Sequence, residues 1–145
     1  MSEQNLRSSV EEAAFPATNT RYGGFWIRFL ASFLDYIILS LGLSFLSFFL
    51  AFPMGVSFLW GMLIEFVYTA VFWRYYSATP GKMILGLQIV KKDGTPIGWR
   101  EIVIRYLGYF VSMIALGLGF LHIAFSARKQ GWHDLMAGTY VIRKN

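Results

Sequence analysis

The sequence contains no cysteine, and only 14% of its 145 residues are charged. The lack of cysteine excludes disulfide bonds and thiolate metal sites, and it leaves the redox compartment open. The low charge content accompanies 56% hydrophobic residues, which is more apolar material than so short a soluble chain can bury. The composition therefore indicates an integral membrane protein with a single domain.

The first 24 residues are polar, and a long apolar run follows them. This run is too long for the core of a signal peptide, so we expect it to remain attached as a membrane anchor. Residues 1–24 are predicted to form a polar cytoplasmic tail, and residues 25–145 to form the transmembrane domain.

Two apolar segments open the predicted domain. Residues 25–52 are long enough to cross the hydrocarbon core as a helix, which takes about 20 residues. Residues 53–55 then break the run at a proline and a glycine, and residues 57–73 form a second apolar segment interrupted by Glu65. We predict two full transmembrane helices in a tight hairpin, with an external turn at Pro53.

The loop at residues 74–105 carries six basic residues against two acidic ones. Positively charged loops stay in the cytoplasm, so the amino terminus is expected there too. Within the loop, β-branched residues flank Asp93-Gly94, a pair typical of tight turns, which indicates a small strand or hairpin. The carboxyl-terminal GTYVIRKN resembles another strand, and pairing of the two would form a small cytoplasmic β-ribbon.

The third apolar region, residues 102–125, decides the topology. As one straight span it would place outside a tail with four basic residues and one acidic residue, against the charge rule. A break at Gly117 and Gly119 would make a short helical hairpin and return the tail to the cytoplasm. We favour the break over the straight span. The predicted fold is an all-α membrane protein with two full spans, this hairpin and the ribbon.

Two charged residues, Arg28 and Asp35, lie seven residues apart in the first span and so occupy nearly the same helix face. Charges in hydrocarbon cost a few kcal/mol or more and usually face a partner or a water-filled path. A tight hairpin would bring Asp35 and Glu65 to a similar depth, where one carboxylate would hold a proton, as a cation/proton exchanger requires. Alternatively, Asp35 bonds Ser or Tyr hydroxyl groups or Arg28, and Glu65 is protonated or faces another protomer.

Three stretches carry a family resemblance: the first span with Arg28 and Asp35, the loop TPGKMILGLQIVKKDGTPIGWREIVIR, and the end GWHDLMAGTYVI. The chain resembles the RDD family of small bacterial membrane proteins, named for one arginine and two aspartates. In this resemblance the family arginine falls on Arg28 and the aspartates on Asp35 and Asp134. Lys82 falls on the lysine of a common PGK motif, and Arg105 on an arginine usual in the later helix.

The resemblance implies a multi-span protein of the bacterial cytoplasmic (inner) membrane. The activity of the family is not established; transport of an unknown ligand has been suggested, and sodium/proton antiport has been proposed for some members. The resemblance thus implies ion or small-solute transport of the cation/proton exchange type. The alternative is a membrane-embedded accessory or scaffold subunit that binds a partner protein and transports nothing.

Arg28 and Asp134 are both expected near the cytoplasmic face and can form a charge-assisted pair that locks the tail onto the first helix. The alternative is that Arg28 holds an anion or a lipid phosphate. His122 lies among apolar residues, where packing or hydrogen bonding is favoured over a proton relay.

The chain offers little sign of other chemistry. The histidines have no carboxylate set at ligand spacing, so we expect no metal and no cofactor. No nucleophile-base pair appears, so we do not expect an enzyme. The expected partners are the lipid bilayer, anionic lipid at the basic loop, and further copies of the chain or a partner membrane protein, because so few helices enclose no spacious path. Nucleic acid is not expected.

Overall fold

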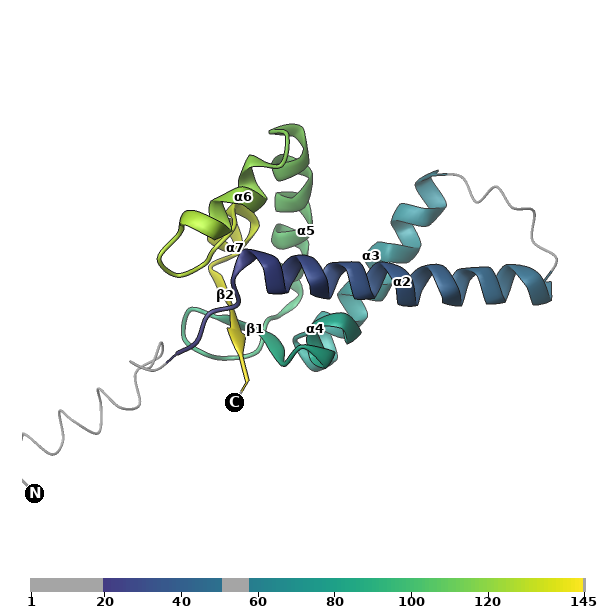
Figure 1. Cartoon of the computed structure of the whole chain (residues 1–145), viewed down its shortest axis with the longest axis horizontal. Helices are drawn as coiled ribbons and strands as arrows, with labels where there is room; N and C mark the ends of the chain where they lie inside the picture. Colours follow the sequence, from purple (N-terminus) through teal and green to yellow (C-terminus); the bar gives the residue numbers. More distant parts are fainter. Residues whose placement is uncertain (1–19, 51–57, 145) are drawn as a thin grey trace, which may run out of the picture.

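A computed structural model of the protein describes residues 20–50 and 58–144 (Figure 1). The predicted Pro53 turn and most of the predicted tail lie outside these residues. The described elements in chain order are α2 (Phe25–Leu50), α3 (Phe58–Tyr76), α4 (Pro80–Ile84), β1 (Leu87–Lys91), α5 (Trp99–Ile114), α6 (Leu118–Phe125), α7 (Trp132–Ala137) and β2 (Thr139–Arg143).

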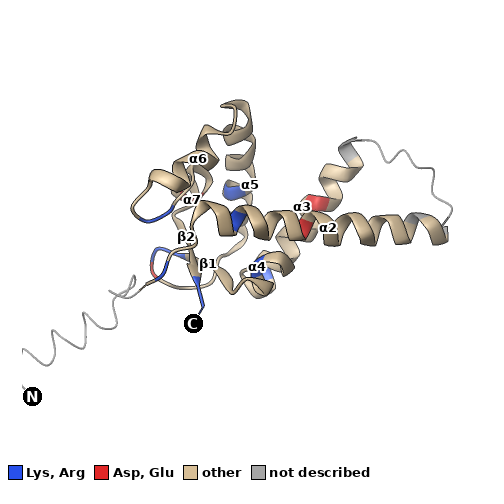
Figure 2. Cartoon of the chain, viewed as in Figure 1, with Lys and Arg blue, Asp and Glu red and all other residues tan. Residues whose placement is uncertain are grey.

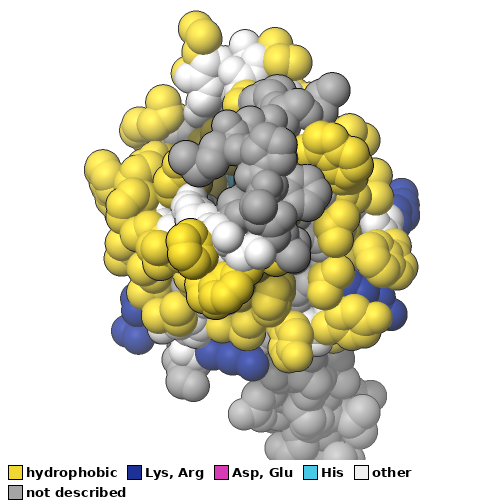
Figure 3. Space-filling model, turned by 90° about the vertical axis from the view of Figure 1, so that its right-hand side faces the viewer, with side chains coloured by type: hydrophobic (Ala, Val, Ile, Leu, Met, Phe, Trp, Pro, Cys, Tyr) yellow, Lys and Arg dark blue, Asp and Glu magenta, His cyan; other side chains and the backbone are white. Residues whose placement is uncertain are grey.

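Helix α2 is long and apolar enough to cross a membrane over Phe25–Leu46, and only 6% of its most apolar stretch is buried within the molecule. The carboxyl-terminal half of α2 carries no charged residue (Figure 2). Figure 3 shows the face seen from the carboxyl end of α2, where hydrophobic side chains dominate and Lys and Arg lie at the margin. The first predicted span therefore has the required length and surface.

Helix α3 is helical where the second span was expected, but it is shorter and less apolar than α2, with Glu65 and Arg74 along it. By length and apolarity, α2 is the single unbroken helix in the described residues that could cross a membrane. The prediction of two full transmembrane helices is therefore not confirmed.

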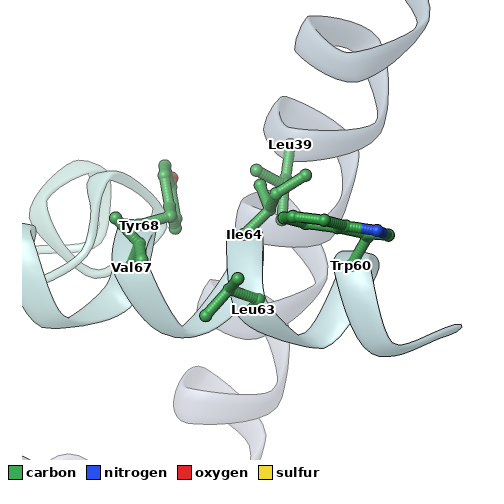
Figure 4. Close-up of a pocket in the computed structure, with 6 residues that line it drawn as sticks. All are labelled: Leu39, Trp60, Leu63, Ile64, Val67 and Tyr68. Atoms are coloured by element: carbon green, nitrogen blue, oxygen red, sulfur yellow. The ribbon is translucent and has the colours of Figure 1, made fainter. Parts of the chain in front are cut away.

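Helices α2 and α3 also cross rather than run alongside each other (Figures 1 and 4). Helix α2 packs mainly against α4 and α6, and α3 packs against α5. Near Asp35 the two helices still meet, because the Tyr68 hydroxyl of α3 donates to Oδ1 of Asp35 on α2. The predicted tight packing of the first two helices is nevertheless not seen in the described residues.

The third apolar region is broken, as predicted. Helices α5 and α6 are bent by 102° at a short break. Leu116 and Gly117 adopt left-handed φ angles of 54° and 79° there, a conformation that glycine takes without strain. The bend is close to a right angle, and α6 packs against α5, α7 and α2.

The small ribbon predicted between the loop and the carboxyl terminus is present. Strands β1 and β2 pair antiparallel, from Leu87 opposite Arg143 to Lys91 opposite Thr139. The backbone just before α2 joins them, because the Gly23 N–H donates to the Val141 carbonyl over 2.8 Å. The start of α2, the basic loop and the carboxyl terminus therefore meet at one end of the molecule.

A hydrophobic core beneath the ribbon joins this end to the helices. Its buried members come from α2, α3, both strands, the β1–α5 loop and α5: Ala31, Ala70, Trp73, Leu87, Ile89, Ile97, Ile102 and Val141. This core holds the two polar clusters described next in fixed positions.

Candidate functional site

Asp134 is the centre of a buried ion-pair cluster. Its side chain is fully buried. One oxygen, Oδ2, accepts from Arg28 Nη1 over 2.5 Å and from the backbone N–H of Gly131, at the start of α7, over 2.9 Å. The other oxygen, Oδ1, accepts from Arg105 Nη1. We call Arg28, Arg105 and Asp134 the arginine node.

The arginines of the node also donate to acceptors on the backbone and on β2. Arg28 donates from Nε to the Gly23 carbonyl over 2.8 Å and from Nη2 to the Lys129 carbonyl. Arg105 also donates to the hydroxyl of Thr139. The node therefore ties α2, α5, α7 and β2 together, and both oxygens of its carboxylate are occupied.

The electrostatics of the node keep Asp134 ionised. Burial alone would raise the pKa of Asp134, but the positive charges of Arg105 and Arg28 outweigh it and hold that pKa below its ordinary value. His133 lies beside the carboxylate, with Nε2 3.5 Å from Oδ1. Burial lowers the pKa of His133 to about 3, so the ring is neutral at physiological pH and adds no charge to the node.

Asp35 is held quite differently, by neutral donors. The backbone N–H of Gly81 donates to Oδ1 over 2.7 Å, and the hydroxyl of Tyr68 donates to the same oxygen over 3.2 Å. The hydroxyl of Thr79 donates to Oδ2 over 2.5 Å. Asp35 itself is half-buried. We call Asp35, Tyr68, Thr79 and Gly81 the Asp35 cradle.

The cradle explains the glycine of the TPGK sequence. A Cβ on Gly81 would collide with the backbone carbonyl of Ala31 and would lie 2.9 Å from Cγ of Asp35. Pro80 is the first residue of α4, a position where a backbone N–H would have no acceptor within the helix, so the lack of an N–H in proline costs nothing. Only a glycine at this position lets the loop approach α2 closely enough for the aspartate to accept its N–H.

Lys82 is buried beside the cradle without a carboxylate partner. Its Nζ donates to Thr79 Oγ1 over a long 3.5 Å and lies 5.8 Å from the centre of the Trp73 ring. It forms no ion pair with any acidic residue in the described part of the chain. Burial lowers the pKa of Lys82 to about 8, against the opposing negative charge of Asp35.

Trp73 lies between the two clusters. Its ring is buried and also faces Arg105, whose Cζ is 5.0 Å from the ring centre. Both Trp73 Nε1 and Arg105 Nε are buried without a hydrogen-bond partner among the described residues, as are Ser112 Oγ and His133 Nδ1. The indole therefore contacts two cations and has an unused donor.

The remaining predicted residues lie elsewhere. Glu65 is exposed on α3, and the hydrogen bonds of Asp35 go to the cradle instead. The Nδ1 of His122 lies 2.8 Å from the Gln130 carbonyl, which gives that ring a hydrogen-bonded place between α6 and α7. In the two described stretches, no three His, Asp or Glu side chains cluster as metal ligands do.

Sequence reasoning assigned no role in the site to Tyr68, Thr79, Gly81 or Trp73. The glycine after proline in TPGK was the one usable signal for this site, because a glycine lets the backbone approach a neighbouring element closely. Nothing local marked Tyr68 or Trp73, because each acts through residues distant in sequence.

An apolar groove opens beside the cradle, where α2 and α3 cross (Figure 4). Its volume is about 380 Å³. Tyr68 both lines this groove and bonds Asp35, so the cradle lies at its edge. The full lining is Leu39, Trp60, Leu63, Ile64, Val67 and Tyr68.

Comparison with known proteins gives a consistent family match. The sequence model of the RDD family matches residues 22–138. The chain is 33% identical to the uncharacterized protein YxaI of Bacillus subtilis, over 83% of this chain and 97% of the relative. It is 36% identical to the uncharacterized protein YckC (81% and 82% covered) and 29% identical to the uncharacterized membrane protein YteJ (85% and 82% covered), both of B. subtilis. No solved structure matches the chain.

Proposed function

Because the chain belongs to the RDD family, we propose that it is a multi-span protein of the cytoplasmic membrane that exchanges a small monovalent cation for a proton. The exchange site in this proposal is the Asp35 cradle together with Lys82. The observation that carries it is the buried ammonium of Lys82, which lies beside a carboxylate without forming an ion pair with it.

The membrane orientation in this proposal follows from charge. The start of α2, the basic loop and β2 meet at one end of the molecule. Positive charge is retained on the cytoplasmic side, so we place this end there, with the amino terminus in the cytoplasm. The same basic residues are suited to contact anionic lipid headgroups.

The proposed exchange conserves charge. In one state Lys82 carries its proton, and its positive charge balances Asp35. In the other state the N–H bond of Lys82 breaks and the proton passes to water, while a monovalent cation binds oxygens of Asp35, Thr79 and Tyr68. A lysine with a pKa of about 8 loses its proton readily near physiological pH, which an ordinary surface lysine does not.

The arginine node has no part in this exchange. The carboxylate of Asp134 is fully buried and has two guanidinium partners, so a cation would have to displace an arginine to reach it. The node instead holds α2 in place against α5, α7 and β2. Two of the residues for which the family is named thus serve to position the third.

Transport in this proposal requires more than one copy of the chain. Almost none of the apolar stretch of α2 is buried, so this helix is free to pack against further helices along its length. Further copies packed along α2 would enclose a path across a membrane. The proposed assembly is therefore a homo-oligomer.

Flux measurements in proteoliposomes test the exchange. We expect sodium-driven proton movement from the wild type, and a loss of at least about tenfold from Asp35→Asn and from Lys82→Met. Glu65→Gln is the matched control, because it removes an exposed acid from the neighbouring helix and should keep the wild-type rate. No flux from folded wild-type protein, or unchanged flux from Asp35→Asn, would overturn the proposal.

A second candidate function is that of an accessory subunit. The observation that favours it is the apolar surface of α2, on which Phe29, Phe33 and Phe45 are each more than half exposed. A helix of a partner protein would cover part of this surface as well as another copy would. A photo-crosslinker at position 45 distinguishes the two: cross-links to the chain itself favour the homo-oligomer, whereas one stoichiometric foreign partner together with absent flux favours the accessory role.

A further inference from the structure

We infer that Lys82, Trp73 and Arg105 form a binding site for a small monovalent anion, either chloride or a carboxylate group. The two cations lie over one indole, with Lys82 Nζ 5.8 Å and Arg105 Cζ 5.0 Å from its centre. All three residues are at least nine-tenths buried. This site is separate from the cradle oxygens, and it does not depend on whether the protein transports anything.

The first argument is the charge balance of the buried region. Arg28, Lys82 and Arg105 are cations, whereas Asp134 and the half-buried Asp35 are the carboxylates nearby. One positive charge is therefore in excess. Buried charges are normally compensated, and one bound monovalent anion would compensate this one.

The second argument is the surplus of donors. Trp73 Nε1 and Arg105 Nε are buried N–H donors without a partner among the described residues. The ammonium of Lys82 has three N–H bonds and one long hydrogen bond to Thr79. The unused groups of these three residues are all donors, so a ligand held by them is an acceptor, and the excess positive charge favours an anion.

The third argument is that neither carboxylate bonds these donors in the structure. The oxygens of Asp134 accept from Arg28, Arg105 and the Gly131 N–H. The oxygens of Asp35 accept from the cradle. The indole N–H is bonded to neither of them, so an acceptor for it would come from outside these two groups.

Thermal unfolding of the purified full chain in detergent tests this site. Sodium chloride and sodium acetate are compared with sodium methanesulfonate, a bulkier anion, at constant ionic strength. Saturable binding should raise the wild-type midpoint by about 3 °C or more at high chloride or acetate. A shift with acetate alone would assign the site to a carboxylate, and a shift with chloride to a halide.

Two matched pairs of variants locate the effect. Trp73→Phe keeps the ring and removes only the N–H, and Trp99→Phe makes the same change at an exposed tryptophan. Lys82→Met removes the buried ammonium, and Lys92→Met removes an exposed one. We expect the anion-dependent shift to disappear in Trp73→Phe and Lys82→Met and to persist in the two controls.

Equal shifts in all variants would show a general salt effect and would overturn the inference. So would the absence of any shift in the wild type. If Trp73→Phe does not fold, anomalous diffraction from crystals grown in bromide decides: a peak between Lys82 and the indole supports the site, and its absence contradicts it.

Discussion

Two aspartates, Asp35 on α2 and Asp134 on α7, are held in opposite ways. Asp134 has no exposed surface, and two arginines occupy its oxygens. Asp35 is half-buried and bonded by two hydroxyl groups and one backbone N–H, with Lys82 nearby but not paired to it. Asp134 is thus neutralised by two buried arginines, whereas Asp35 is bonded only by neutral donors, and the proposed exchange depends on this difference.

Asp134→Asn should have the largest effect on stability. It would leave Arg28 and Arg105 buried without a counter-charge, and breaking a buried pair in this way costs about 3–5 kcal/mol. Unfolding in a denaturing detergent series measures the loss. Asp93→Asn, in an exposed turn of the loop, should change little. Equal effects of the two changes would mean that the arginine node does not lock the fold.

Gly81→Ala should have the next largest effect. The added methyl group would collide with the Ala31 carbonyl and push α4 away from α2, at a cost of about 1–3 kcal/mol. Gly61→Ala makes the same change in α3 where no atom lies within 4 Å, and it should be neutral or slightly stabilising. A neutral Gly81→Ala would show that α4 does not dock on Asp35.

The comparison predicts a smaller cost for Asp35→Asn than for Asp134→Asn. The amide keeps one acceptor oxygen and leaves no buried cation without its ion-pair partner, so the loss should be about 1–2 kcal/mol. The same unfolding series measures it. A cost as large as that of Asp134→Asn would make the cradle a second lock rather than an exchange site.

The last prediction is a dependence of stability on pH that arises from Lys82. Its folded-state pKa of about 8 lies below the ordinary value of 10.5, so between these pH values the unfolded chain binds more protons. Stability should therefore rise with pH across this window, by up to about 1.4 kcal/mol per pH unit from this residue. Lys82→Met should remove the rise, and Lys92→Met should keep it. A wild-type slope that survives in Lys82→Met would contradict the assignment.

Several features were predictable because each satisfies a charge or a hydrogen-bonding group that would otherwise be unfavourably placed. The break near Gly117 follows from the charge of the tail, which a straight span would place on the wrong side. The pairing of Arg28 with Asp134 follows from the cost of an unpaired charge, and the ribbon from two β-branched stretches with unpaired edges. In each case a polar group needed a partner and the chain offered few.

Other features were not predictable because they depend on long-range packing. The Asp35–Glu65 pair was expected only if α2 and α3 ran side by side, but the two helices cross and Glu65 is exposed. A Tyr hydroxyl was among the alternatives for Asp35, and Tyr68 supplies one, but another of its donors is a backbone N–H 46 residues away, which no side-chain pattern indicates. Trp73 gave no signal beyond its size, although it lies between both clusters.

The most direct test of the exchange site is proton release on cation binding. Purified protein in weakly buffered detergent near pH 8 is mixed with sodium gluconate, with choline gluconate as the control. We predict release of up to one proton per chain from the wild type, and none from Asp35→Asn or Lys82→Met. No release from the wild type, or equal release from Asp35→Asn, would contradict the account.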